Sequence, residues 1–297
     1  MASMISKDPG MREINLDDLT QYSPWPARLL GLENWGIPTR DTTKTEQEYN
    51  RDHYARCLRY FSEAVQKPTP EDVRRFQYEI EGFSSLDSTV CVSSGDRLYL
   101  TRLSSALGDI NRIMTQTMSA AIAEASTVIE LGSGYGYFLW MLSQHFPDKA
   151  WRGGDYSMNA VRLSRQLFGN RTDIRVVQMD FYEPETYKFI QECASPIVVF
   201  TARSIEQLPE SACVFNALGE CSRKVGDVFH FEPVYELYSD TLLGLMRRRY
   251  TQVNDYNRDL LSQLRSRPSI RIVEVKEDVV GIPPLNPMCV IHWRFVQ

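Results

Sequence analysis

Short apolar segments alternate with amphipathic segments from residue 126 to the end of the chain. The stretches between the first five apolar segments place their apolar residues at helical spacing, as in MNAVRLSRQLF. Because strands that alternate with helices pair in parallel, this pattern predicts a parallel sheet with helices on both faces. The predicted strands are residues 126–131, 150–155, 174–180, 196–201, 226–232, 269–276 and 288–295.

The last two predicted strands are joined by the turn-rich stretch VVGIPPLNP and by no helix. Two strands connected in this way form a hairpin, which makes the last strand antiparallel to its neighbours. One long helix is predicted before this hairpin, over residues 237–265. The predicted fold class is therefore α/β, with a seven-stranded, mostly parallel sheet whose last strand is antiparallel.

The first part of the chain is predicted to be helical, with no clear strand before Val90. Residues 45–65 have the spacing of an amphipathic helix with one aromatic face. A second helix begins in the segment PTPEDVRRF, where Thr69 is placed to cap it and Pro70 to occupy its first position. A long helical stretch is expected over residues 96–124.

These patterns predict two parts, a helical N-terminal cap over residues 1–95 and an α/β domain over residues 96–297. The cap contains aromatic residues that are expected to close over a pocket of the α/β domain, where ring faces can hold a cation. A plain hydrophobic interface between the two parts is the alternative explanation. The aromatic residues are Trp25, Trp35, Tyr49, Tyr54 and Tyr60.

Composition and charge restrict the classes of function. The 297 residues are 43% hydrophobic, which is enough for a core, and the net charge of −5 gives no general attraction to nucleic acid. No apolar run approaches the roughly 18 residues that span a bilayer, and the N-terminus lacks a hydrophobic signal region. The six cysteines are scattered without a CxxC pair, which predicts no metal site and a cytoplasmic location.

Three glycines follow the first predicted strand in the segment VIELGSGYGYF. They are Gly132, Gly134 and Gly136, and such a loop lets a ligand approach the backbone closely. A dinucleotide fingerprint has its third glycine one residue later, and the acid Glu130 would repel a diphosphate. The pattern therefore disfavours an NAD-dependent oxidoreductase and suits a ligand that carries an ammonium group and no phosphate.

The loop VIELGSGYGYF resembles the first motif of class I S-adenosylmethionine-dependent methyltransferases, and the resemblance extends over about residues 96–297. It implies a Rossmann-like domain that binds S-adenosylmethionine. By this resemblance Asp155 holds the two ribose hydroxyls, and Asp180 holds the adenine amine, with Phe181 beside the ring and Met158 on its other face. The implied cofactor-binding residues are Glu130, Gly132, Gly134, Gly136, Asp155, Met158, Asp180, Phe181 and Thr201.

Each of these side chains also has a structural interpretation. Asp155 and Asp180 are placed to cap helices, and Met158 suits a hydrophobic core. A scaffold protein that retained the fold without catalysis is an alternative to an enzyme, although the intact loop and both acids favour the enzyme. A nucleic-acid methyltransferase is not supported, because the fourth strand is not followed by an Asn/Asp-Pro-Pro-Tyr/Phe tetrad.

Residues that follow the fourth and fifth predicted strands normally line the acceptor site of this family. Glu206, Glu232 and Glu236 lie there, and clustered carboxylates complement a cation such as a guanidinium. His230 lies within a strand, where a hydrogen-bonded core histidine is the ordinary interpretation and a catalytic base the alternative. Arg203 is placed to pair with a carboxylate of the substrate or the cofactor, or to form a structural salt bridge.

The predicted activity is methyl transfer to a small molecule, in which the protein mainly aligns the acceptor with the sulfonium. The main prediction is N-methylation of a guanidinium- or amine-bearing metabolite such as arginine, bound by Glu206, Glu232 and Glu236. The alternative is O-methylation of a hydroxylated secondary metabolite with His230 as the base. The expected partner is this small molecule, cationic in the main prediction, with no nucleic acid and no membrane; a homodimer is compatible with the sequence.

Overall fold

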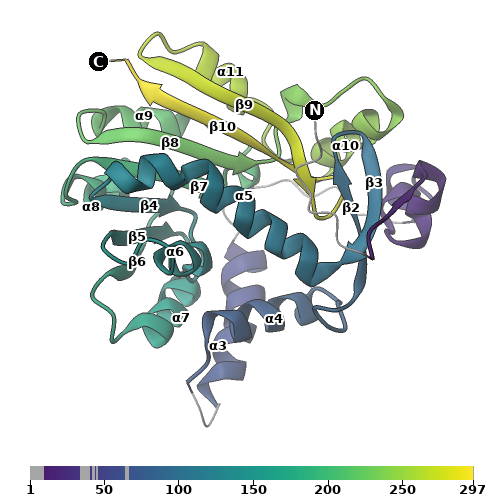
Figure 1. Ribbon diagram of the computed structural model, residues 1–297, viewed down its shortest axis with the longest axis horizontal. Coiled ribbons are helices and arrows are strands. Elements are labelled where there is room, and N and C mark those ends of the chain that lie inside the picture. The colour runs from purple at the N-terminus through teal and green to yellow at the C-terminus, as the bar shows by residue number, and fades with distance from the viewer. Residues whose placement is uncertain (1–9, 34–40, 42–43, 45, 64–66, 297) are drawn as a thin grey trace.

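The computed structural model describes residues 10–33, 41, 44, 46–63 and 67–296. The strands in this part of the chain are β1 (Arg12–Ile14), β2 (Thr89–Ser94), β3 (Arg97–Arg102), β4 (Thr127–Leu131), β5 (Ala150–Asp155), β6 (Ile174–Gln178), β7 (Ile197–Ala202), β8 (Val225–Glu232), β9 (Ile270–Gly281) and β10 (Pro287–Phe295). They form one sheet in the order β1-β3-β2-β9-β10-β8-β7-β4-β5-β6 (Figure 1).

The helices in the described residues are α1 (Trp25–Leu29), α3 (Ala55–Ser62), α4 (Pro70–Ile80), α5 (Leu103–Glu124), α6 (Tyr137–Ser143), α7 (Met158–Phe168), α8 (Lys188–Gln191), α9 (Ala212–Glu220), α10 (Leu242–Val253) and α11 (Leu260–Arg265). Shorter helical turns are η1 (Leu16–Gln21), the π-helix η2 (Glu46–Tyr54), η3 (Pro184–Tyr187), η4 (Ile205–Gln207) and η5 (Tyr235–Leu237). No helix among the described residues is long and apolar enough to cross a membrane.

The α/β prediction is confirmed, but the predicted sheet of seven mostly parallel strands is wrong in its strand count and its pairing. The five strands β4 to β8 pair in parallel, as the alternation of strands and helices predicts. The C-terminal hairpin of β9 and β10 is confirmed, and β10 runs antiparallel to both neighbours. Beyond β9, the strands β2, β3 and β1 extend the sheet with further antiparallel pairs, so ten described strands contain more antiparallel than parallel pairings.

The hairpin of β2 and β3 replaces the first part of the helical stretch that the sequence predicts over residues 96–124. Ser94 pairs with Arg97, so the connection is the two residues Gly95 and Asp96. Gly95 has a φ of +56°, a left-handed value that glycine adopts without strain. The helix begins only at Leu103, and the proposed boundary at residue 95 falls inside this turn.

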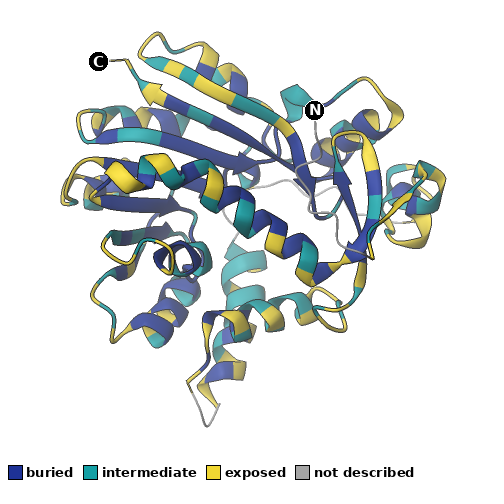
Figure 2. Cartoon of the chain, viewed as in Figure 1, coloured by how far each residue is buried: buried dark blue, intermediate teal, exposed yellow. Residues whose placement is uncertain are grey.

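The parallel strands bury both faces, because successive residues of a strand point to opposite sides of the sheet. In β4, Val128 packs into the core on the side of α5, α6 and α7, whereas Ile129 packs on the side of α9 and α11. Figure 2 shows the central strands as almost wholly buried and α5 with one exposed face. Each fully buried Val or Ile side chain contributes about 1.5–3 kcal/mol relative to exposure.

The single helix predicted over residues 237–265 is wrong, since α10 and α11 are separate helices. Asp255 takes a φ of +50° after α10 ends, which turns the chain out of the helix. The side chain of Asn257 then accepts the backbone N–H of Leu260 at the start of α11. In the N-terminal part, α4 is confirmed where the sequence places it, and Thr69 and Asp72 form a reciprocal capping box.

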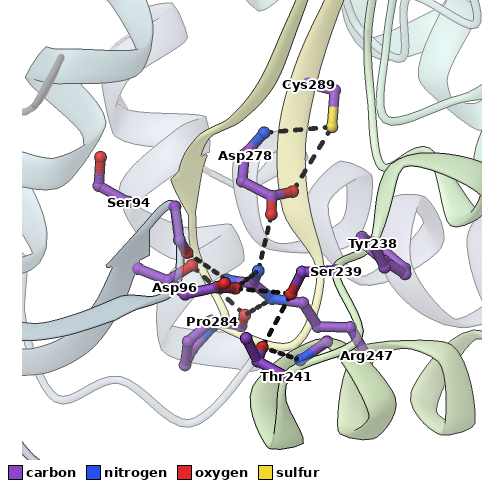
Figure 3. Close-up of polar contacts among 12 residues, drawn as sticks. Ser94, Asp96, Tyr238, Ser239, Thr241, Arg247, Asp278, Pro284 and Cys289 are labelled. Carbon is purple, nitrogen blue, oxygen red and sulfur yellow. Dashed lines mark hydrogen bonds and ion pairs between the residues drawn. The ribbon is translucent and has the colours of Figure 1, made fainter. Parts of the chain in front are cut away.

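The buried guanidinium of Arg247 connects α10 to the antiparallel half of the sheet (Figure 3). Nη1 lies 2.8 Å from Oδ2 of Asp278 in β9, and Nη2 donates to the carbonyl of Gly95 in the β2–β3 turn. Nε donates to the carbonyl of Pro284 in the connection between β9 and β10. One side chain therefore positions three segments, and the Pro284 segment forms part of the cavity wall described below.

Replacing this cation should destabilise the fold, because Asp278 would remain as an uncompensated buried charge. We expect Arg247→Met to lower the free energy of unfolding by roughly 3–5 kcal/mol, measured by urea denaturation. Arg249→Met, at an exposed position on the same helix, is the control and should change it by less than about 0.5 kcal/mol. Equal effects of the two substitutions would show that the Arg247 network does not stabilise the protein.

Candidate functional site

A cavity of about 680 Å³ lies at the carboxyl ends of β4, β5, β7 and β8. Its other walls include α4, N-terminal aromatic residues, and parts of β2, α5 and the β9–β10 connection, so the cap and the α/β domain both contribute to it. Ligands of open α/β sheets bind at this end of the strands. The lining includes Trp25, Tyr49, Tyr54, Arg74, Gln77, Tyr78, Glu81, Phe83, Glu130, Gly132, Gly134, Asp155, Asp180, Phe181, Arg203, Gln207, Phe231, Pro283, Pro284 and Met288.

The glycine loop after β4 leaves its backbone open to the cavity at two of its three glycines. Gly132 and Gly134 line the cavity, with φ values of +74° and +54° that favour glycine. A Cβ on Gly132 would lie 2.2 Å from Cβ of Ser204, and one on Gly134 would lie 2.3 Å from the hydroxyl oxygen of Tyr54. Gly136 does not line the cavity but caps α6. A side chain at Gly132 would clash with Ser204, and one at Gly134 would have to displace the hydroxyl of Tyr54, so both positions favour glycine.

Asp155 at the end of β5 joins the glycine loop to the start of α7. Its Oδ2 accepts the backbone N–H of Gly134 at 2.6 Å, and its Oδ1 accepts that of Ser157 at 2.8 Å. Burial raises the pKa of Asp155 to about 6, against the effect of these two hydrogen bonds. The buried Glu130 also lines the cavity, and its Oε2 has no partner among the described residues. Burial and the nearby Asp155 raise the pKa of Glu130.

The remaining predicted cofactor residues divide between the cavity and the core. Asp180 and Phe181 follow β6 and line the cavity, and Asp180 accepts the backbone N–H of Tyr182. Met158 begins α7 and packs against the hydrophobic core instead of the cavity. Thr201 is fully buried, and its hydroxyl lies 2.9 Å from Nδ1 of His230.

The four predicted catalytic side chains lie outside the residues that line the cavity. Glu232 is fully buried and accepts the backbone N–H groups of Ser204 and Ile205, which begins η4. Glu206 accepts a hydrogen bond from the amide of Asn286 at 2.8 Å. The structure thus uses both carboxylates to hold loops together.

Glu236 and His230 are likewise engaged in the framework. Glu236 accepts the backbone N–H groups of Leu261 and Ser262, both at 2.7 Å, at the start of α11. The fully buried His230 lies between Thr201 and the indole N–H of Trp293, which donates to its Nε2 at 2.9 Å. Burial lowers the pKa of His230 to about 3, so the ring is neutral at physiological pH.

Helix α4 supplies cavity residues that the sequence analysis missed. Arg74, Gln77, Tyr78 and Glu81 line the cavity, and their spacing of three, four and seven residues places them on one face of a helix. Arg74 lies 3.9 Å from the ring centre of Tyr137 and donates to the side chain of Asn111. In the sequence, these four residues form a row of polar side chains at helical spacing beside the apolar face of a capped helix. This row is the pattern from which the four cavity residues could have been predicted.

The aromatic residues of the cap are partly placed as the sequence predicts. Trp25, Tyr49 and Tyr54 line the cavity, whereas Tyr60 is 58% exposed and stacks on Phe76. Trp35 lies outside the described residues. The segment η2 is held against the α/β domain by Asn50, which accepts hydrogen bonds from the hydroxyl of Ser157 and the backbone of Asn159.

No family model matches the chain, and no curated protein matches it. Its structure is similar to a putative methyltransferase from Thermobifida fusca, with 13% identity, a TM-score of 0.49, and coverage of 64% of this chain and 82% of that chain. It is also similar to the S-adenosylhomocysteine-bound Podospora anserina methyltransferase PaMTH1, with 11% identity, a TM-score of 0.45, and coverage of 89% and 100%. The pyocyanin biosynthetic protein PhzM matches with 14% identity, a TM-score of 0.45, and coverage of 63% of this chain and 56% of that chain.

The neutral, buried His230 gives the protein a specific sensitivity to acid. Its pKa is about 3 when folded and about 6.5 when unfolded, so below pH 6.5 the unfolded chain binds a proton that the folded chain does not. Stability is therefore lost as the pH falls through 6.5, by about 2 kcal/mol at pH 5 from this group. Urea denaturation gives the decrease in the free energy of unfolding between pH 7.5 and pH 5.0. We expect this decrease to be about 2 kcal/mol smaller in His230→Gln than in the wild type. The same pH-dependent loss in both proteins would contradict the buried, neutral histidine.

Proposed function

We propose that the protein is an S-adenosylmethionine-dependent methyltransferase that acts on a small molecule. The observation that carries this proposal is the convergence on one cavity of the bare loop at Gly132 and Gly134, the carboxylate of Asp155, and the pair Asp180 and Phe181. Each feature comes from the end of a different strand. Each also occupies the position at which the sequence resemblance implies a contact with S-adenosylmethionine.

The described residues fit this cofactor. Asp155 would hold the ribose hydroxyls, Asp180 the adenine amine and Phe181 the ring face, while the glycine loop allows the adenosyl group to contact the backbone. When bound, S-adenosylmethionine supplies a methyl group on a positively charged sulfur. The carboxylate of Asp155, whose pKa is about 6, gives this end of the cavity a negative charge at neutral pH that complements a cation.

The arrangement supports O-methylation better than the N-methylation of a guanidinium. N-methylation was predicted from Glu206, Glu232 and Glu236, and these carboxylates hold turns and a helix start instead of lining the cavity. Many of the other residues that line the cavity are aromatic or apolar, which suits a flat hydroxylated ring. These aromatic and apolar residues include Trp25, Phe83, Phe231, Pro283 and Met288.

Glu81 is the group we propose as the base that accepts the hydroxyl proton, in place of His230. It lines the cavity at the C-terminal end of α4; part of the residue is exposed, and desolvation of its carboxyl group raises its pKa. A raised pKa brings a carboxylate closer to the pH at which it must accept a proton, which favours general base catalysis. His230 is excluded from this role by its position, because both of its ring nitrogens are engaged in the core.

The test supplies the purified protein with methyl-labelled S-adenosylmethionine and two sets of acceptors, hydroxylated aromatic molecules and arginine. We expect label in the hydroxylated aromatics, and a loss of roughly 10²-fold or more in kcat for Glu81→Gln. Glu79→Gln, at an exposed position on the same helix, is the control and should retain the wild-type rate. Transfer to arginine and to no hydroxylated acceptor would reject O-methylation in favour of the guanidinium prediction.

A further inference from the structure

The turn that follows β7 contains two buried polar atoms that have no hydrogen-bond partner among the described residues. They are Nη2 of Arg203 and Oε1 of Gln207; both atoms are buried, and both residues line the cavity. The amide nitrogen of Gln207 donates to Glu206 at 3.0 Å, so only its oxygen is left without a partner. Buried polar groups are normally satisfied, so an unpaired donor and an unpaired acceptor in two residues that line one cavity point to a ligand that supplies both partners.

The backbone holds Arg203 in a conformation that its own preferences disfavour. Its φ is +54°, a left-handed value that is uncommon for a residue with a Cβ. Its N–H donates to the carbonyl of Phe231, and the next two N–H groups are fixed by Glu232. Strain that the surroundings enforce in this way is concentrated at functional sites. The turn therefore fixes the backbone of Arg203 at the edge of the cavity that this residue lines.

The surroundings of Arg203 leave its charge incompletely balanced. The charge of Arg203 lowers the pKa of Glu81, yet no ion pair to Arg203 is found within the described parts of the chain. The other described acids of the lining are Asp41, Glu130, Asp155 and Asp180, and the last three belong to the proposed cofactor half. Arg74, the other described arginine of the lining, already donates to Asn111. Arg203 is thus the cation placed to receive an anion.

We infer that the acceptor is an aromatic carboxylic acid whose carboxylate is bound by Arg203, with Gln207 accepting a hydrogen bond from a neighbouring hydroxyl. This inference depends on the proposed function, and it names the substrate class of the same cavity. A guanidinium matches a planar carboxylate in geometry as well as charge. The apolar walls around it accommodate the aromatic ring, and Arg203 acts as a specificity-determining residue.

The experiment is a calorimetric titration of the protein, with and without S-adenosylhomocysteine, with two matched probes. The probes are 2-hydroxybenzoate and its neutral amide, 2-hydroxybenzamide. We expect the carboxylate to bind tenfold or more tightly than the amide in the wild type, and Arg203→Gln to abolish that preference. Arg203→Gln should change the affinity for S-adenosylhomocysteine by less than twofold. Arg249→Gln removes the same charge at an exposed position and should retain the preference.

Three results would overturn the inference. They are equal affinities of the wild type for the two probes, a carboxylate preference that survives in Arg203→Gln, and a tenfold loss of S-adenosylhomocysteine affinity in that variant. The last would assign Arg203 to the carboxylate of the cofactor. If the wild type does not bind S-adenosylhomocysteine, the proposed function is contradicted. The titrations of the two probes without S-adenosylhomocysteine still decide whether Arg203 binds the carboxylate, so the two failures can be told apart.

Discussion

The close packing of the glycine loop against the turn after β7 is the constraint on which the site depends. No side chain fits at Gly132, because Ser204 occupies the space where its Cβ would lie. The hydroxyl of Ser204 in turn donates to the carbonyl of Leu131, so the exits of β4 and β7 are fixed to each other. This contact helps to place Asp155, at the end of β5, and Arg203, just after β7, at one cavity.

Buried carboxylates build the frame around this contact. Glu232 binds the backbone of the turn after β7, and burial together with the neighbouring Glu206 raises its pKa to about 7. Glu236 performs the same kind of task at the start of α11. Charged groups in such positions resemble catalytic residues in a sequence, because both occur where strands end. What separates them is whether the residue lines the cavity, since Asp155 also accepts backbone N–H groups but lines the cavity, whereas Glu232 and Glu236 do not.

The sequence predicted the parts of the fold that depend on local pattern. Strand and helix alternation identified β4 to β8, and the Gly132 to Gly136 spacing located the cavity. The pattern did not predict that β2 and β3 join the sheet, because the pairing of β2 with β9 connects residues nearly two hundred positions apart. The contribution of α4 to the cavity wall was missed for a similar reason. Arg74 and Glu81 reach the cavity only because α4 packs beside α6, a tertiary contact that the periodicity of α4 alone does not specify.

The central claim is that the cavity binds the adenosyl cofactor through Asp155, and calorimetric titration with S-adenosylhomocysteine tests it most directly. Ionised Asp155 accepts hydroxyl hydrogen bonds best, and its pKa is about 6. We predict that the wild type binds S-adenosylhomocysteine with micromolar affinity and that this affinity falls as the pH drops below about 6. In Asp155→Asn we predict an affinity at least tenfold lower that does not change over this pH range. Undiminished affinity in Asp155→Asn, or no binding by the wild type, would contradict this claim.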